Sequence, residues 1–191
     1  MASLPEIYRA LFGAVRLARL DPGGMAYFDT SIRGFWASFT AAFLVLPLYV
    51  LMLWIRYEQG VEVAPLDRLV PIKGLAFAMS WLAFPVAMIS LAASLGKWDR
   101  YVGFVVAYNW AGALQNGLFM ILIALTDLGA FPGALGSTLL LAAFVLVLGY
   151  AWFVAKTALD VPGTVAAGIV AMDFMIGMLI DLVADGMLAR S

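Results

Sequence analysis

The sequence predicts an all-α membrane protein, a polytopic bundle of five transmembrane helices preceded by an N-terminal amphipathic helix at the membrane interface. Three observations lead to this prediction. Of the 191 residues, 65% are hydrophobic and 12% are charged, whereas soluble domains have roughly 45–50% and about 25%. The mean hydropathy is +1.01. Several apolar stretches also reach the about 20 residues that a helix needs to cross a hydrocarbon core.

Residues 1–34 are predicted to form a cytoplasmic arm. Ser3 and Glu6 have the spacing of a capping box, which marks the start of a helix. The apolar residues that follow recur with helical periodicity and form one stripe: Leu4, Ile7, Tyr8, Leu11, Phe12 and Val15. Three arginines accompany this helix, namely Arg9, Arg16 and Arg19. The pattern leaves two placements open, a helix lying in the headgroup layer of the membrane and a helix packed on the end of the bundle.

Residues 35–191 are predicted to form the transmembrane domain. Its five spans are expected at residues 35–55, 74–95, 101–125, 134–155 and 162–183. Backbone polar groups in lipid must bond within their own segment, so each span is expected to be an α-helix. The later connections are short, which predicts that neighbouring spans run antiparallel in one bundle.

The distribution of basic residues predicts a cytoplasmic N-terminus and a C-terminus outside. In this orientation the larger group lies inside: Arg9, Arg16, Arg19, Arg33, Lys97, Arg100 and Lys156. The smaller group lies outside: Arg56, Arg68, Lys73 and Arg190. Loops rich in Lys and Arg stay on the cytoplasmic side of a membrane, and the bias here has that sign.

The composition excludes most kinds of catalytic and metal site. The chain has no histidine and no cysteine, which removes imidazole acid–base chemistry, thiol nucleophiles and the usual zinc and iron–sulfur ligands. With a net charge of −1 it also lacks the basic surface of a nucleic-acid-binding protein. We therefore expect neither an enzyme nor a bound cofactor.

Polar residues inside the predicted spans are the candidate functional residues. Asp173 lies about halfway along the fifth span, where a carboxylate costs roughly 2.5–3.5 kcal/mol. Asp181 and Asp185 follow it after eight and twelve residues and share its helix face. The third span offers polar partners in Asn109, Gln115 and Asn116. Two interpretations stay open: a protonated Asp173 that clamps two helices through an amide, and a relay for protons or ions.

Small residues repeat every four positions in two spans. They are Gly103, Ala107 and Ala111 in the third span, and Gly163, Ala167 and Ala171 in the fifth. Such a ladder allows another helix to approach closely. The sequence leaves open whether that helix belongs to the same chain, to a second copy or to another membrane protein.

Several short words and the layout resemble the Yip1 family of small five-span membrane proteins, in particular its bacterial members. The words are ARLDPGGMAYFD (Ala18 to Asp29), GFWASF (Gly34 to Phe39) and YNW (Tyr108 to Trp110). The resemblance covers about residues 25–185 and implies a five-span fold in a bacterial inner membrane. Eukaryotic relatives are linked to vesicle traffic and small GTPases, whereas the bacterial relatives have no agreed activity, so the resemblance implies a fold more than a function.

Two functions are therefore expected from the sequence. The first is a non-enzymatic inner-membrane protein of the Yip1-like type that organises the lipid bilayer or partner proteins. The second is a small permease, or a subunit of one, with a polar path at Asp173 and the amides Asn109, Gln115 and Asn116. A permease requires an aqueous cavity that reaches Asp173, whereas an organiser requires a dry and packed Asp173.

Overall fold

The computed structural model describes residues 2–131 and 133–189. Within these ranges the chain is helical and has no strand. The elements are α1 (Leu4–Ala18), the 3-10 helix η1 (Pro22–Tyr27), α2 (Ile32–Ser38), α3 (Thr40–Glu58), α4 (Leu66–Ser94), α5 (Trp98–Asp127), α6 (Ala134–Leu159) and α7 (Gly163–Ala189).

The five predicted spans correspond to the long helices, but the helices are longer than the spans. The helix α4 begins eight residues before the predicted residue 74, and α7 continues to Ala189 rather than to residue 183. The predicted single span 35–55 is divided at Phe39 into α2 and α3. At this division the hydroxyl of Ser38 donates to the carbonyl of Phe35, a bond that competes with regular helix bonding.

Four helical segments are long and apolar enough to cross a membrane: Ile32–Glu58, Leu66–Ser94, Ala134–Leu159 and Gly163–Ala189. The helix α5 is not among these four, although it is the longest helix of the described chain. Its hydropathy is lowered by the amides of Asn109, Gln115 and Asn116. Buried residues are also concentrated in its first half, which protein rather than lipid surrounds.

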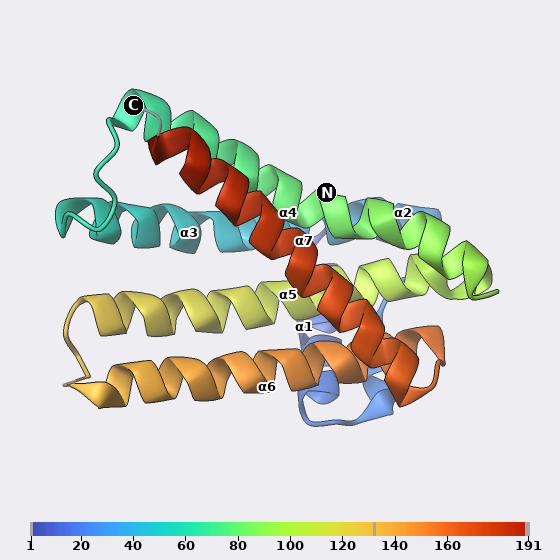
Figure 1. Ribbon diagram of the computed structural model, residues 1–191. Coiled ribbons are helices and arrows are strands. Elements are labelled where there is room, and N and C mark those ends of the chain that lie inside the picture. The colour runs from blue at the N-terminus through green and yellow to red at the C-terminus, as the bar shows by residue number, and fades with distance from the viewer. Residues whose placement is uncertain (1, 132, 190–191) are drawn as a thin grey trace.

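The long helices run back and forth between two ends of the bundle (Figure 1). We call the end with the α4–α5 and α6–α7 connections the near end. The far end holds the α3–α4 and α5–α6 connections and the end of α7. The helix α5 packs against α1, α2, α3, α4 and α6 and is the centre of the bundle. The helix α7 runs diagonally from α6 to α4.

The packed core lies in the half of the bundle next to the near end. Its largest fully buried side chains include Phe84 of α4, Phe104 of α5 and Leu159 of α6. Toward the far end, large apolar side chains such as Leu118, Leu146 and Leu182 are exposed. In α6 and in α7, only 11% of the most apolar stretch is buried inside the protein. These two helices therefore present their apolar surface outward.

The helix α1 packs against the bundle, lying behind α5 and α6 in Figure 1. Its buried side is made of small residues together with Leu17, and the phenol of Tyr150 in α6 donates to the Ala14 carbonyl at 2.6 Å. The predicted stripe of bulky residues is divided: Ile7 and Leu11 pack against the core, whereas Leu4 and Tyr8 are 82% and 75% exposed. Of the two placements considered, contact with the bundle is therefore present, and it uses the small residues together with part of the predicted stripe.

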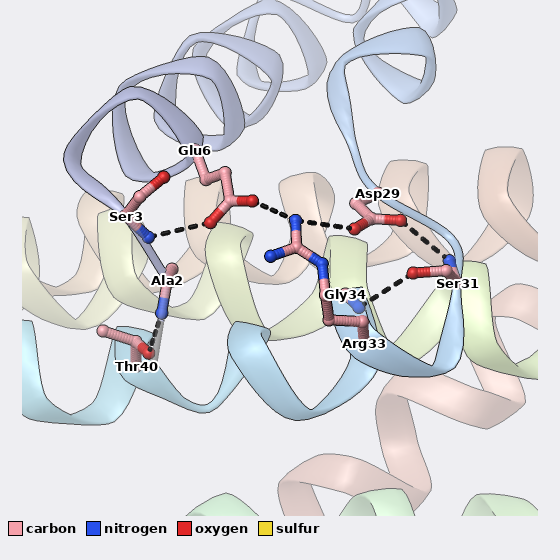
Figure 2. A network of polar contacts seen from close by, with 8 residues as sticks. All are labelled: Ala2, Ser3, Glu6, Asp29, Ser31, Arg33, Gly34 and Thr40. Carbon is pink, nitrogen blue, oxygen red and sulfur yellow. Dashed lines mark hydrogen bonds and ion pairs between the residues drawn. The ribbon is translucent and has the colours of Figure 1, made fainter.

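A charged network fastens the beginning of α1 to the start of α2 (Figure 2). Glu6 accepts hydrogen bonds from the backbone of Ser3, at 2.8 Å, and from Arg33, which also lies 3.7 Å from Asp29. These bonds favour the ionised carboxylate, chiefly through Ser3 and next through Arg33, and lower the pKa of Glu6 to about 2. The predicted capping box is confirmed, and it is also part of a tertiary contact.

Candidate functional site: a polar cavity between α5 and α7

A cavity of about 460 Å³ lies among α4, α5, α6 and α7. Its polar lining comes mainly from α5 and α7, with Ser80 and Trp81 from α4. From α5 come Tyr108, Gln115 and Asn116, and from α7 come Asp173, Asp181 and Asp185. The cavity therefore brings Asp173 together with two of the three amides that the sequence singled out.

The packing of the helices explains why a space remains here. The helices α4 and α6 each pack against both α5 and α7. They hold α7 across the bundle on a diagonal, so that α5 and α7 face one another over the cavity (Figure 1). Glycines at positions 112 and 177 line the cavity and leave it unobstructed by side chains. The space is a product of helix geometry and of small residues on both of its main walls.

Asp173 is paired with a tyrosine. The phenol of Tyr108 donates a hydrogen bond of 2.9 Å to Asp173 Oδ1 and bridges α5 to α7. The prediction that Asp173 bonds an amide of the third span is therefore wrong. In the sequence, Tyr108 stands out only within the motif YNW and not as a polar group inside a span. A phenol carries a polar group on an aromatic ring and is easily assigned to packing or interface anchoring alone.

Asn109 belongs to a different contact. It is fully buried, and its Nδ2 donates to the hydroxyl of Ser38 at 2.8 Å. Asn109 and Asn116 are seven residues apart on similar sides of α5, but about 10 Å apart along the axis. At the level of Asn109 the neighbour is α2, and at the level of Asn116 it is the cavity. The structure therefore removes Asn109 from the predicted polar cluster.

The other two amides remain in the cluster. Gln115 lines the cavity and donates from Nε2 to the Val147 carbonyl of α6 at a long 3.3 Å. Asn116 lines the same wall and is exposed. Amide groups in this arrangement offer both donors and acceptors to a ligand or to water.

Acidic groups dominate the charge of the cavity. Asp173, Asp181 and Asp185 span about 18 Å along α7, since twelve residues separate the first from the last. Among the described residues that line the cavity there is no basic side chain. The nearest paired cation is Lys73 of α4, whose Nζ lies 2.9 Å from Asp185 Oδ1 at the far end. The cavity is thus electrostatically suited to a cation.

The described residues contain no group of three or more carboxylates close enough to hold a metal ion. The three aspartates follow α7 one or two turns apart rather than converging on one point. A ligand in the cavity could therefore contact one carboxylate, amide or phenol after another, but not several carboxylates at one point.

The arginines of the arm lie outside this cavity. Arg16 donates to Asp21 and to the phenol of Tyr27, and its guanidinium lies over the Tyr27 ring. The hydrogen bond from Arg16 favours the ionised carboxylate of Asp21 and lowers its pKa. Arg9 donates to the Ala26 carbonyl at 3.3 Å, and Arg19 is exposed. Two of the three therefore hold η1 against α1, a role that the sequence did not indicate.

The two small-residue ladders have different positions. In α5, Ala107 and Ala111 are buried within the bundle, and Gly103 faces the side chain of Thr30. In α7, Gly163 contacts Trp152, whereas Ala167 and Ala171 are exposed. The first ladder therefore serves packing inside the chain, and the second remains on the surface.

Comparisons with protein families, with curated proteins and with solved structures find no match to this chain.

Proposed function

We propose that this protein is a small five-span permease, or a permease subunit, for a cationic solute, and that it resides in a bacterial inner membrane. The observation that carries the proposal is the polar cavity that reaches Asp173. Each carboxylate exposed to lipid near the centre of a span costs roughly 2.5–3.5 kcal/mol. Asp173, partly buried near the middle of α7, is therefore best explained by a space that holds water or a polar solute, and Asp181 and Asp185 continue the acidic lining toward the far end.

In this proposal α5 also crosses the membrane, in addition to the four apolar helical segments, and is the central span of the five. Its amides face the cavity or α2 rather than lipid, so a low hydropathy is compatible with crossing the membrane. The near end is cytoplasmic, as the basic residues Arg33, Lys97 and Arg100 favour. The exposed bulky face of α1, with Leu4 and Tyr8, then lies in the interface of the cytoplasmic leaflet.

A Yip1-like organiser of membrane or partner proteins is the second candidate. The observation in its favour is the exposed small-residue face of α7, formed by Ala167, Gly168 and Ala171. A helix of another copy or of a partner can approach such a face closely. This role does not require the cavity to contain water.

The test uses the chain's lack of cysteine. Single substitutions Asn116→Cys and Asp173→Cys are placed in the full chain in proteoliposomes and exposed to a membrane-impermeant thiol reagent. Uptake of radiolabelled methylammonium and of rubidium is measured in parallel. The permease predicts labelling at both positions and uptake that Asp173→Asn reduces at least tenfold, which corresponds to about 1.4 kcal/mol.

Asp160→Asn is the matched control, because Asp160 is exposed on the α6–α7 connection in the left-handed conformation that asparagine tolerates. It should leave uptake unchanged. Protection of both cysteines, together with uptake no faster than in empty liposomes, would reject the permease and leave the organiser.

A further inference from the structure

Lys73 does not line the cavity itself but is paired with Asp185, the lining residue nearest the far end. It lies in α4, its side chain is only 15% exposed, and it is paired with two carboxylates at once. Its Nζ is 2.9 Å from Asp185 of α7 and 3.4 Å from Glu62 of the α3–α4 connection. Asp185 lines the cavity, and Glu62 does not.

The two partners differ in their surroundings. The side chain of Glu62 is 16% exposed and lies 3.8 Å from Arg56, which in turn lies 3.7 Å from Asp127 of α5. The side chain of Asp185 is 63% exposed. Lys73 is therefore joined on one side to a largely covered chain of charges and on the other side to an exposed carboxylate of the cavity lining.

We propose that the ammonium of Lys73 blocks the far end of the cavity by pairing with Asp185. The end opens when this ammonium leaves Asp185 and stays paired with Glu62. The proposal rests on the proposed permease, because it describes how a cation enters the same cavity. A cation that reaches Asp185 replaces the lysine ammonium there. Glu62 then keeps the released ammonium paired, which avoids the cost of an unpaired charge in a covered site.

The same geometry explains the selectivity that such a site would have. The lysine ammonium already occupies the outermost carboxylate of the cavity, so an entering solute must compete with a primary ammonium group. Neutral and anionic solutes are not attracted to Asp185 and therefore do not displace the lysine ammonium from it. Lys73 is thus a positioning residue that sets which solutes enter, and it does not touch the solute at Asp173.

The experiment measures access to the cavity rather than transport. The full chain carrying Asn116→Cys is reconstituted in proteoliposomes, and a cationic, impermeant thiol reagent is added at the far end. Lys73→Gln should raise the labelling rate about fivefold, the change expected from losing one partly exposed ion pair. Lys73→Arg, which keeps the charge, should leave the rate near that of the parent.

A second variant protects the test against misfolding of the first. Lys73→Gln with Asp185→Asn removes both charges of the pair and leaves no unpaired carboxylate, and it should also be labelled quickly. Glu62→Gln should have the opposite effect and slow the labelling, because Lys73 then has only Asp185. Arg68→Gln is the control: Arg68 also joins α4 to α7, through the Met187 carbonyl at 2.8 Å, and its loss should leave the rate unchanged.

The outcomes separate this proposal from the proposed function. If Asn116→Cys is labelled at the same rate in the parent, in Lys73→Gln and in the double variant, the accessible cavity is supported and the blocking role of Lys73 is rejected. Absence of labelling in all variants rejects both. If Arg68→Gln raises the labelling rate as much as Lys73→Gln does, α4 is generally loosened from α7, and the blocking role of Lys73 is again rejected.

Discussion

Two adjacent polar side chains on α5 bond to different neighbours, and this difference decides which of them can meet a solute. Tyr108 bonds to Asp173 across the cavity, whereas the adjacent Asn109 bonds to Ser38 of α2 inside the core. Asn109 therefore has a structural role, and Tyr108 holds the carboxylate that the proposed function requires.

The Asn109–Ser38 pair gives a prediction for stability. Ser38→Ala leaves the buried amide of Asn109 without its hydroxyl partner and should lower the free energy of unfolding by about 1–3 kcal/mol. The measurement is the unfolding midpoint of the purified protein in detergent. Ser38→Ala combined with Asn109→Leu removes both partners and should recover part of the loss.

Ser94→Ala is the control for this pair. The Ser94 hydroxyl bonds to the carbonyl three residues earlier, as that of Ser38 does, but Ser94 is exposed. Its substitution should change the free energy of unfolding by no more than about 0.5 kcal/mol. Equal losses for the two alanine variants would contradict the proposed role of Asn109.

The candidate site could be predicted from the sequence only in part. Asp173, Gln115 and Asn116 could be identified, because a polar group within an apolar stretch stands out by composition alone. The loss of Asn109 to α2 depends on the break at Phe39, and no change in hydropathy marks that break. Tyr108 was missed as the partner because an aromatic residue near a membrane has an ordinary explanation as an anchor.

Among the elements, α1 is the one whose position depends most on charged groups. Its small residues pack against α5 and α6, and Gly13 lies against η1 so closely that a Cβ there would be 2.9 Å from the Gly24 carbonyl oxygen. Its first turn is held by Glu6, which is bonded to Ser3 and Arg33 (Figure 2). Loss of the Glu6 charge should therefore weaken the attachment of α1.

This attachment gives a prediction for pH dependence. The pKa of Glu6 is lowered from 4.5 to about 2 in the folded protein, so its stabilising contribution is complete above pH 4.5 and is lost as the pH falls toward 2. Glu6→Gln should have a lower unfolding midpoint than the wild type at pH 6. The difference between the two should shrink steadily and vanish near pH 2.

The comparison with Glu6→Gln is needed because the pKa values of Asp21 and Asp29 are also lowered, so the wild type alone would report several groups together. A difference in unfolding midpoint that is the same at pH 6 and at pH 2 would contradict the role assigned to the Glu6 carboxylate.

The helices themselves were predicted more accurately than their ends. Apolar length identifies the part of a helix that lies in lipid, but backbone hydrogen bonding continues past it through residues such as Asp67, Asp99 and Lys156. The packing face of α1 was predicted only in part for a similar reason. Alanine and glycine carry little weight in a hydropathy pattern, yet they form the face that packs.

For the whole molecule, the proposed topology makes α5 a membrane-spanning helix. If it spans, the α3–α4 and α5–α6 connections lie on the same side of the membrane, and the α4–α5 connection lies on the other side. Figure 1 shows the first two connections together at the far end of the bundle.

Single cysteines test this topology in intact cells. Val63→Cys, at a position 85% exposed, and Ala130→Cys report the far end, and Ser94→Cys reports the near end. An impermeant thiol reagent should label the first two at once and Ser94→Cys only after the membrane is permeabilised. Labelling of Val63→Cys without labelling of Ala130→Cys would mean that α5 does not span the membrane. Immediate labelling of Ser94→Cys, with Val63→Cys and Ala130→Cys labelled only after permeabilisation, would mean that the orientation is the opposite of the one proposed.

The central position of α5 has a consequence for synthesis of the chain. A translocon releases a nascent helix into lipid according to its hydrophobicity, and α5 is the helix whose partitioning is weakened by its own amides. Its neighbours α3 and α4 leave the ribosome earlier, and α6, against which it packs most extensively, leaves later. In the proposed five-span topology, insertion of α5 therefore depends on the arrival of α6, and the two helices should enter the bilayer together as one hairpin.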